Sequence, residues 1–262
     1  MFFREGKLII MKKIVLITGT TSGIGQATAR IFAQNEHRLI ITGRRETRLK
    51  ELALQLSAEY GVEVLPLVFD VRDKKAVQTA ADNLPVEWRN IDILVNNAGL
   101  AVGLGPIQEG MIDDWERMID TNIKGLLYVT RCFSPFMITK NSGHIINIGS
   151  VAGKEVYPNG NVYCATKHAV DALSRAMRID MVKHGIKVTQ IAPGAVETEF
   201  SVVRFKGDQE KADNFYKGFT PLRGEDIAAL VYYVTTLPVH VCINDLVVTP
   251  TAQASATLIN RS

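Results

Sequence analysis

Four polar side chains occur in an order that could move a proton to or from a substrate oxygen. Tyr163 and Lys167 lie four residues apart in a helical pattern, so they share one face of the predicted helix. A nearby ammonium favours the phenolate of a tyrosine, whose ordinary pKa is about 10, and so brings it closer to neutral pH. Ser150 could hydrogen-bond the reacting oxygen, and Asn122 lies inside a predicted long helix. We expect a catalytic set, although each residue by itself is also typical of a surface pair, a turn cap or a solvated helix position.

A glycine-rich loop upstream of these residues is typical of a dinucleotide site. Residues 18–25 read TGTTSGIG, follow an apolar run and lead directly into a helical pattern. The glycines would let the backbone approach a pyrophosphate, and the helix amides would face the phosphates. Glycines that serve only a tight turn are the alternative. The cofactor-binding residues expected here are Gly19, Thr21, Ser22, Gly23, Ile24 and Gly25.

The second predicted strand ends in residues that favour NADP over NAD. About 20 residues past the glycine loop, where an acidic residue would bind the ribose of NAD, the chain has Gly43, Arg44 and Arg45. A carboxylate would repel a 2′-phosphate, whereas a guanidinium binds it through charge-assisted hydrogen bonds. We therefore expect NADP, with Arg44 preferred to Arg45 as the phosphate ligand. The alternative is that both arginines only begin a solvated helix.

Two more predicted strands end in residues suited to a bound nucleotide. Asp70 follows the third strand and could bind an adenine amino group, and residues 96–99 read NNAG after the fourth. Small and amide side chains there would let the cofactor pass close to the sheet edge, although NNAG alone is simply a good turn. The further cofactor contacts expected are Asp70, Val71, Asn97, Ala98 and Gly99.

Apolar runs alternate with helical patterns along the chain, which predicts one α/β domain with a doubly wound sheet. The predicted strands are Lys13–Thr18, Arg38–Thr42, Val62–Phe69, Ile91–Val95, His144–Ile148, Lys187–Ile191 and Leu246–Val248. The predicted helices are Ile24–Gln34, Arg45–Tyr60, Lys74–Asn83, Asp113–Thr139, Val162–Lys183 and Glu225–Thr236. We expect a Rossmann-like sheet of about seven parallel strands with helices on both faces.

Composition narrows the class of protein. The chain has 262 residues, 47% of them apolar and 22% charged, which is ordinary for one globular domain. A net charge of +3 with scattered basic residues does not predict a nucleic-acid interface. The three cysteines, Cys132, Cys164 and Cys242, have no ligand-like spacing and are interpreted as reduced thiols rather than a disulfide frame or a zinc site.

The first residues form a separate piece in our interpretation. Residues 1–11 end at a second methionine, Met11, and their apolar pieces are interrupted by charge and too short for a signal or a membrane span. We expect a frayed N-terminal extension, with the start codon open between Met1 and Met11. A single domain over residues 12–262 follows.

Taken together, these motifs resemble the short-chain dehydrogenase/reductase family over nearly the whole chain, from Lys12 to about Thr251. The resemblance implies Tyr163 as general acid/base, with Lys167 lowering its pKa and holding the nicotinamide ribose. It implies Ser150 as the group that positions the substrate oxygen and Asn122 as the anchor of a water, without a metal. The further nicotinamide contacts that it implies are Pro193, Gly194, Val196 and Thr198.

Four longer runs are similar to the NADP-dependent 3-hydroxy acid dehydrogenases, which are also described as serine, L-allo-threonine or malonic semialdehyde oxidoreductases. These runs are IDILVNNAGLAVG, WERMIDTNIKGLLYVTR, GHIINIGSVAGKEVYPNGNVYCATK and VETEFSVVRFKGD. The similarity implies a small 3-hydroxy acid as substrate, a cytoplasmic location and a homotetramer. A broad carbonyl reductase or alcohol dehydrogenase of the same family is the alternative, and a non-catalytic NADP-binding protein is disfavoured by the full set of catalytic residues.

A small hydroxy acid requires a cation for its carboxylate. Residues 199–219 are long, mixed and rich in Phe and Val, as expected for a lid over the nicotinamide pocket. We propose Arg204 in this segment as the carboxylate ligand, with Lys154 as the second choice. The alternative is an arginine that covers core with its apolar stem.

Overall fold

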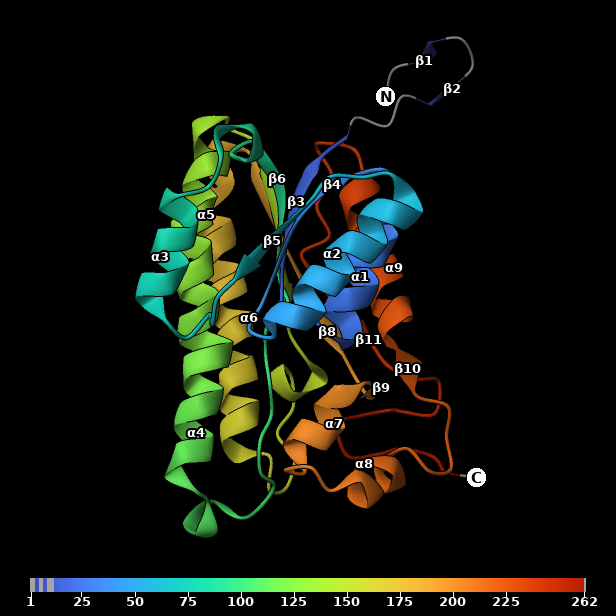
Figure 1. The fold of residues 1–262 in the computed structure, drawn as a ribbon. Coiled ribbons are helices and arrows are strands. Elements are labelled where there is room, and N and C mark those ends of the chain that lie inside the picture. Colours follow the sequence, from blue (N-terminus) through green and yellow to red (C-terminus); the bar gives the residue numbers. More distant parts are fainter. Residues whose placement is uncertain (1–2, 5–6, 9–11, 262) are drawn as a thin grey trace.

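Runs rich in Val, Ile and Leu form a seven-stranded sheet in the computed structural model, which describes residues 3–4, 7–8 and 12–261 (Figure 1). The strand order is β11-β8-β7-β6-β3-β4-β5, and every neighbouring pair is parallel. The strands are β3 (Ile14–Thr18), β4 (Arg38–Gly43), β5 (Val64–Val68), β6 (Ile91–Asn96), β7 (Gly143–Ile148), β8 (Ile186–Pro193) and β11 (Asp245–Val248). The predicted strands agree with these bounds to within two residues at every end.

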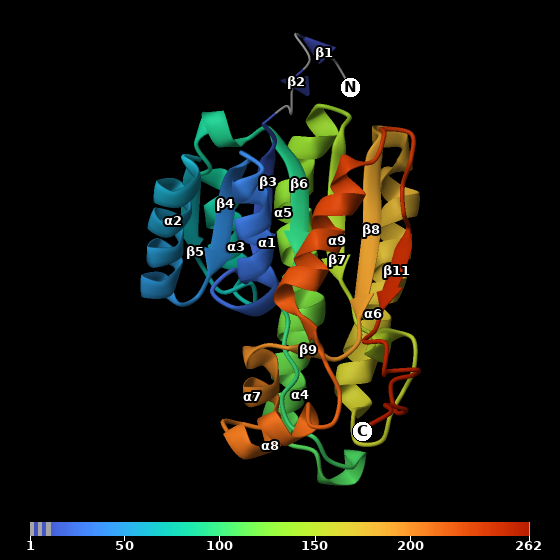
Figure 2. The ribbon, with the colours of Figure 1, turned by 90° about the vertical axis from the view of Figure 1, so that its right-hand side faces the viewer.

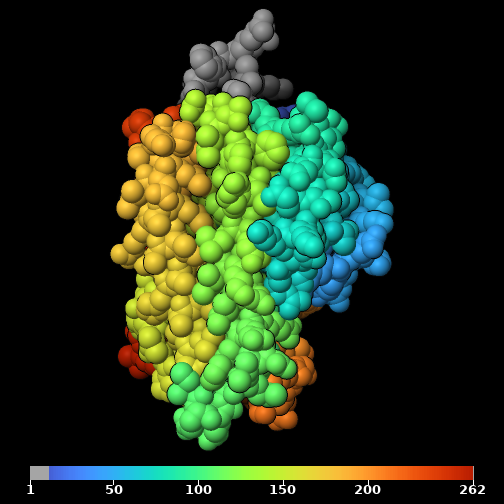
Figure 3. Space-filling view, turned by 90° about the vertical axis from the view of Figure 1, so that its left-hand side faces the viewer, coloured from blue at the N-terminus to red at the C-terminus, as the bar shows by residue number. Residues whose placement is uncertain are grey.

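Helices cover both faces of the sheet, as predicted. One layer holds α1 (Gly23–Gln34), α2 (Glu46–Tyr60) and α9 (Gly224–Thr236) (Figure 2). The other holds α3 (Lys74–Asp82), α4 (Ile112–Ile119), α5 (Leu126–Thr139) and α6 (Asn161–Met181), and Figure 3 shows α6, α5 and α3 side by side on that face. Short 3₁₀ turns lie at Val86–Trp88, Ile107–Glu109, Val151–Gly153 and Val182–His184.

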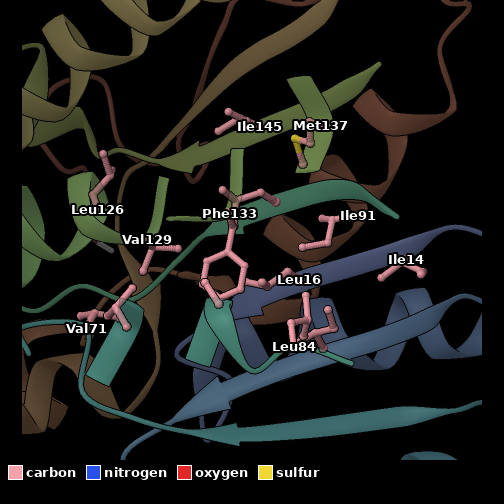
Figure 4. Packing of buried hydrophobic residues seen from close by; sticks show 14 of the residues in the cluster. Ile14, Leu16, Val71, Leu84, Ile91, Leu126, Val129, Phe133, Met137 and Ile145 are labelled. Atoms are coloured by element: carbon pink, nitrogen blue, oxygen red, sulfur yellow. The ribbon is translucent and has the colours of Figure 1, made fainter. Parts of the chain in front are cut away.

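Each helical layer buries its own apolar core against the sheet. On one side Phe133 of α5 is fully buried against the β3–β6–β7 face, among Leu16, Ile91 and Ile145 (Figure 4). On the other side Phe32 of α1 anchors an equivalent cluster. A strand that is buried on both faces has no solvent-exposed side that would carry polar residues, which explains why its sequence is a nearly continuous apolar run.

The predicted helix Asp113–Thr139 differs from the structure in one respect. It is interrupted by a π-helical turn, Asp120–Gly125, between α4 and α5. The turn contains Asn122 and ends at Gly125, where an added Cβ would lie 2.7 Å from a Val71 side-chain carbon. A larger residue at position 125 would therefore collide with the loop after β5.

Residues 199–219 fold into two short helices, α7 (Glu199–Arg204) and α8 (Gln209–Phe215), beside the paired strands β9 (Val196–Glu197) and β10 (Leu222–Arg223). Figure 2 shows both helices at the end of the sheet where β9 lies. At the N-terminus β1 (Phe3–Arg4) pairs with β2 (Lys7–Leu8). The expected frayed extension over residues 1–11 otherwise lies outside the described residues. Within the described part of the chain, no helix is both long and apolar enough to span a membrane.

Candidate active site

A cavity of about 490 Å³ lies beyond the carboxyl ends of the central strands, with α7 and α8 over it. The predicted residues that line it are Gly19, Thr21, Ser22, Gly23, Ile24, Arg44, Arg45, Asp70, Val71, Asn97, Ala98, Gly99, Ser150, Tyr163, Lys167, Pro193, Gly194, Val196, Thr198 and Arg204. Two predicted residues, Gly25 and Asn122, are not part of the lining. A doubly wound sheet binds its ligand at this edge, so the topology brings the dispersed motifs together.

The glycine loop has the geometry that a pyrophosphate requires. Gly19 and Gly23 have φ angles of +70° and +55°, which side chains rarely adopt. A Cβ on Gly25 would lie 2.3 Å from the Gly19 carbonyl oxygen, so this glycine lets α1 pack directly behind the loop. No described side chain caps the first turn of α1, whose amides remain available to an anion.

Asn97 holds this loop in place from the neighbouring strand. Its Nδ2 donates to the carbonyl oxygens of Thr18 and Gly19, at 2.8 and 3.0 Å, and its backbone N–H donates to Thr18 Oγ1 at 3.0 Å. The predicted role of the NNAG motif in tying down adjacent backbone agrees with these contacts.

The two arginines after β4 have different partners. Arg45 lies on the glycine loop, where its Nε donates to Thr21 Oγ1 and one terminal nitrogen donates to Thr21 O and Ser22 Oγ, each at 2.9 Å. Arg44 instead forms an ion pair with Asp70 at 3.6 Å. The preference for Arg44 over Arg45 finds no support in these contacts, because it is Arg45 whose guanidinium lies against the loop.

Asp70, predicted to contact adenine, is held by a neighbouring guanidinium. Arg72 donates to both of its carboxylate oxygens, at 2.7 Å for the shortest contact. Burial acts to raise the pKa of Asp70, but Arg72 and Arg44 outweigh it and lower that pKa below its usual value. The side chain therefore stays an ionised hydrogen-bond acceptor in the lining of the cavity.

Tyr163 and Lys167 are buried on one face of α6. The Lys167 Nζ donates to the Ile148 carbonyl oxygen at 2.9 Å and lies 6.0 Å from the centre of the Tyr163 ring. Burial lowers the pKa of Lys167 to about 8. Burial also raises the pKa of Tyr163, with Tyr157 acting in the same direction, whereas the Ser150 hydroxyl and the Arg204 guanidinium act to lower it. The closeness predicted for this pair is present, and Arg204 is a second cation beside the phenol.

Asn122 reaches the site through the backbone. Its Oδ1 accepts from Leu100 N at 2.9 Å, and its Nδ2 donates to Leu100 O at 2.8 Å and to Thr166 Oγ1 at 3.0 Å. The side chain is 2% exposed. Asn122 thus joins the π-helical turn to the loop after β6 and to α6, one residue before Lys167.

Arg204, the predicted carboxylate ligand, lies next to the catalytic tyrosine candidate. Its Cζ is 5.8 Å from the centre of the Tyr163 ring, and a terminal nitrogen donates to Tyr157 Oη at 2.8 Å. The Nε is buried without a hydrogen-bond partner among the described residues. Buried donors are normally paired, so this nitrogen has unused capacity for an acceptor.

Lys154 was a wrong second choice for this role. It forms ion pairs with Asp171, at 2.5 Å, and with Asp245. It does not line the cavity. Its ammonium group is therefore already occupied by two carboxylates.

Known proteins resemble this chain in sequence over most of its length. A family model described as short chain dehydrogenase matches residues 13–209, most of the chain. The chain belongs to this family. It is 50% identical over 251 residues to the NADP-dependent 3-hydroxy acid dehydrogenase YdfG of Salmonella typhimurium, covering 95% of this chain and 100% of the relative. It is also 50% identical over 253 residues to sulfoacetaldehyde reductase 2 of Chromohalobacter salexigens, covering 96% of this chain and 100% of the relative.

A solved structure matches equally well. The closed form of serine dehydrogenase complexed with NADP⁺ has a TM-score of 0.89 at 48% identity, covering 95% of this chain and 100% of that one. The family and the fold class predicted from the sequence are confirmed, and this short-chain dehydrogenase is an oxidoreductase. The NADP-dependent dehydrogenase and the NADP⁺ complex of serine dehydrogenase agree with the predicted cofactor, NADP.

Several residues that line the cavity of this short-chain dehydrogenase were not predicted. Tyr157 binds Arg204, and Phe200 packs on Tyr163 with ring centres 5.8 Å apart. Gln253 lies near the C-terminus, and its Oε1 accepts from the backbone N–H of Ala195 at 2.8 Å. Tyr157 carried a weak signal as an aromatic residue between Ser150 and Tyr163. The position of Gln253 had none, because it depends on where the C-terminal segment folds back.

Proposed function

We propose that this chain is an NADP-dependent oxidoreductase that transfers a hydride between the nicotinamide and C3 of a small 3-hydroxy acid, with Tyr163 as general acid/base. The observation that carries the proposal is the placement of Arg204 beside Tyr163 in one cavity, with 5.8 Å between Cζ and the ring centre. This short separation suits a molecule whose carboxylate and reacting oxygen are a few bonds apart. The guanidinium supplies the charge-assisted donors that a carboxylate requires.

The same cavity fits NADP as the cofactor. The glycine loop with its two left-handed glycines would cradle the pyrophosphate, and Arg45 with Arg44 would bind the 2′-phosphate at the end of β4, where Gly43 replaces the acidic residue that suits NAD. Asp70 would bind the adenine, and residues 193–198 the nicotinamide end. When bound, NADP supplies the ring that accepts or donates the hydride.

The protein's own part is to handle the proton. In the direction of reduction the Tyr163 hydroxyl gives its proton to the substrate oxygen, and in the direction of oxidation the phenolate takes it back. Ser150 holds that oxygen, and Arg204 and Lys167 place positive charge near the phenol, which favours the phenolate. Asn122 uses its side chain to fix the Leu100 backbone and α6, and its main chain would anchor the water.

The test of substrate class is Arg204→Met. The KM for L-serine, L-allo-threonine and 3-hydroxypropionate should rise about ten- to a hundredfold, because a charge-assisted bidentate contact is lost. The KM for a neutral aldehyde should stay within about twofold. Arg131→Met, an exposed arginine on α5, is the matched control. An equal loss with acids and with the neutral aldehyde would overturn the carboxylate assignment and favour a broad carbonyl reductase.

A sulfonate is the second candidate for the anionic group. Sulfoacetaldehyde reductase 2 is as similar to this chain as the hydroxy acid dehydrogenase is, and Arg204 can bind either anion with the same donors. Steady-state rates with sulfoacetaldehyde and malonic semialdehyde, each with NADPH, distinguish the two. A higher kcat/KM for the sulfonate would move the substrate assignment to sulfonated aldehydes without changing the catalytic residues.

We also propose that the protein works in the cytoplasm as a homotetramer. Exposed apolar side chains along the outer face of α4 and α5 support self-association: Ile112 is 65% exposed, and Ile119 and Leu127 are more than one-third exposed. Light scattering after size exclusion gives the mass directly. A monomer of 28.9 kDa would contradict the assembly.

A further inference from the structure

One carboxylate joins the lid segment to the arginine at the adenosine end of the cavity. Glu199 is the first residue of α7, and its Oε2 accepts from an Arg45 terminal nitrogen at 2.8 Å. Its Oε1 accepts from Arg48 at 3.0 Å. Glu199 and Arg45 both line the cavity, although they lie some 150 residues apart in the chain.

Arg45 has little hydrogen-bonding capacity left. A guanidinium has five N–H donors. In this structure three of them bind Thr21 Oγ1, Thr21 O and Ser22 Oγ, and a fourth binds Glu199. An arginine usually binds a phosphate through two parallel N–H donors. Binding of that kind to Arg45 requires the release of at least one present acceptor.

Glu199 is the acceptor that a phosphate removes most readily. The other three acceptors are neutral groups of the glycine loop, whereas Glu199 carries a negative charge that a phosphate dianion repels. The displaced carboxylate also keeps Arg48 as a partner. Arg45 and Glu199 are 40% and 50% exposed, so neither is locked by packing.

We propose that Glu199 is a specificity-determining residue for the cofactor, because its carboxylate competes with the 2′-phosphate of NADP for Arg45. The inference rests on the proposed binding of NADP. NAD has no 2′-phosphate and leaves the Glu199–Arg45 pair intact. Glu199 therefore weakens binding of the phosphorylated cofactor alone, and it couples occupancy of the 2′-phosphate site to the first turn of α7.

The test measures binding of cofactor fragments by isothermal titration calorimetry, without turnover. The probes are 2′,5′-ADP, which carries the 2′-phosphate, and 5′-AMP, which does not. Glu199→Gln should bind 2′,5′-ADP about two- to fivefold more tightly than the unmodified protein at low salt, as expected for the loss of an exposed ion pair. Binding of 5′-AMP should be unchanged. Glu197→Gln removes an exposed carboxylate two residues away that does not line the cavity, so it controls for net charge.

A variant that lacks Arg45 tests whether Glu199 acts by competing for this arginine. In Arg45→Met, the additional change Glu199→Gln should have a smaller effect on 2′,5′-ADP binding, because the contested partner is gone and only direct repulsion of the phosphate is relieved. Unchanged or weaker 2′,5′-ADP binding by Glu199→Gln would overturn the inference. So would an equal gain in Glu197→Gln, or a gain of the same size without Arg45. Failure of the unmodified protein to bind 2′,5′-ADP or NADP would instead contradict the proposed function.

Discussion

The floor of the cavity and the segment over it are held by different kinds of interaction. The floor comprises the lining residues Asn97, Tyr163 and Lys167 together with Asn122, which supports them. Asn97, Asn122 and Lys167 each bond to backbone carbonyls of a neighbouring loop or strand, and Asn122 and Lys167 are nearly inaccessible. Over the cavity, α7 has an ion pair near each end, Glu199 with Arg45 and Lys206 with Asp114 at 2.6 Å. The floor is fixed by short polar contacts inside the protein. The segment above it has partly buried contacts as well, such as Ser201 Oγ with Tyr216 Oη, but its two ion pairs are partly exposed to solvent.

The two kinds of interaction differ in how much free energy is lost when one of them is broken. Leaving a buried polar group unpaired costs about 1–3 kcal/mol, whereas an exposed ion pair contributes about 0–1 kcal/mol. The residues proposed to handle the proton should therefore stay aligned when the ion pairs near the ends of α7 are broken. The comparison predicts large effects for changes in the floor and small, salt-dependent effects for changes in the segment above it.

The largest expected effect follows from removing one hydroxyl in the floor. Tyr163→Phe should lower kcat by about a thousandfold, since general acid/base groups contribute about 10²–10⁴ in rate. NADP binding and the unfolding temperature should be nearly unchanged, which steady-state kinetics and calorimetry can measure. Tyr233→Phe, a change at an exposed tyrosine of α9, is the control. A loss below tenfold would mean that another group carries the proton.

Asn122→Ala tests whether the buried hydrogen bonds of Asn122 stabilise the floor. The change leaves the N–H and C=O of Leu100 without their partner, so the free energy of unfolding should fall by about 3 kcal/mol. Urea denaturation measures it, with Asn90→Ala at an exposed position as the control. A fall of less than about 1 kcal/mol would show that the loop after β6 does not depend on this side chain.

Burial of Lys167 should make the free energy of unfolding increase with pH in the alkaline range. Burial lowers its pKa to about 8 in the folded protein, so it loses its proton there before the unfolded chain does, near 10.5. Below pH 8 both states are protonated and the full cost of burying the ammonium remains; between pH 8 and 10 this cost fades as pH rises. The stability of the unmodified protein relative to Lys167→Met should therefore increase by about 2 kcal/mol across that range. Chemical denaturation at pH 8, 9 and 10 measures the difference, and a constant difference would contradict a buried ammonium.

The smallest effect is expected at the ion pair between Lys206, just after α7, and Asp114 of α4. Asp114→Asn removes the partner of Lys206 and should raise the KM for hydroxy acids about two- to threefold, with kcat within twofold. The difference from the unmodified protein should shrink between about 0.05 and 0.5 M NaCl, because the Lys206 side of this pair is 47% exposed and salt screens it. Asp113→Asn, its exposed neighbour, is the control. A salt-independent change would indicate a packing role for Asp114 instead.

The two regions also differ in how far the sequence predicted them. The strands and the glycine loop came out to within two residues because nearly continuous apolar runs and left-handed glycines are local signals. The choice between Arg44 and Arg45 was not local, since it depends on where Thr21, Ser22 and Glu199 meet. Gln253 was missed for the same reason, because its partner Ala195 lies 58 residues away in the chain.

The π-helical turn has a consequence for how α4 and α5 can vary. One extra residue in a helix rotates everything after it by about 100°. This rotation lets Met118 of α4 face the small core beside Tyr163 while Val129 of α5 faces the main core under the sheet. The apolar faces of α4 and α5 therefore point in different directions around a common helix axis. Deleting a single residue between Asp120 and Gly125 would make the helix regular while turning one half away from its core, even though every contacting residue type was retained.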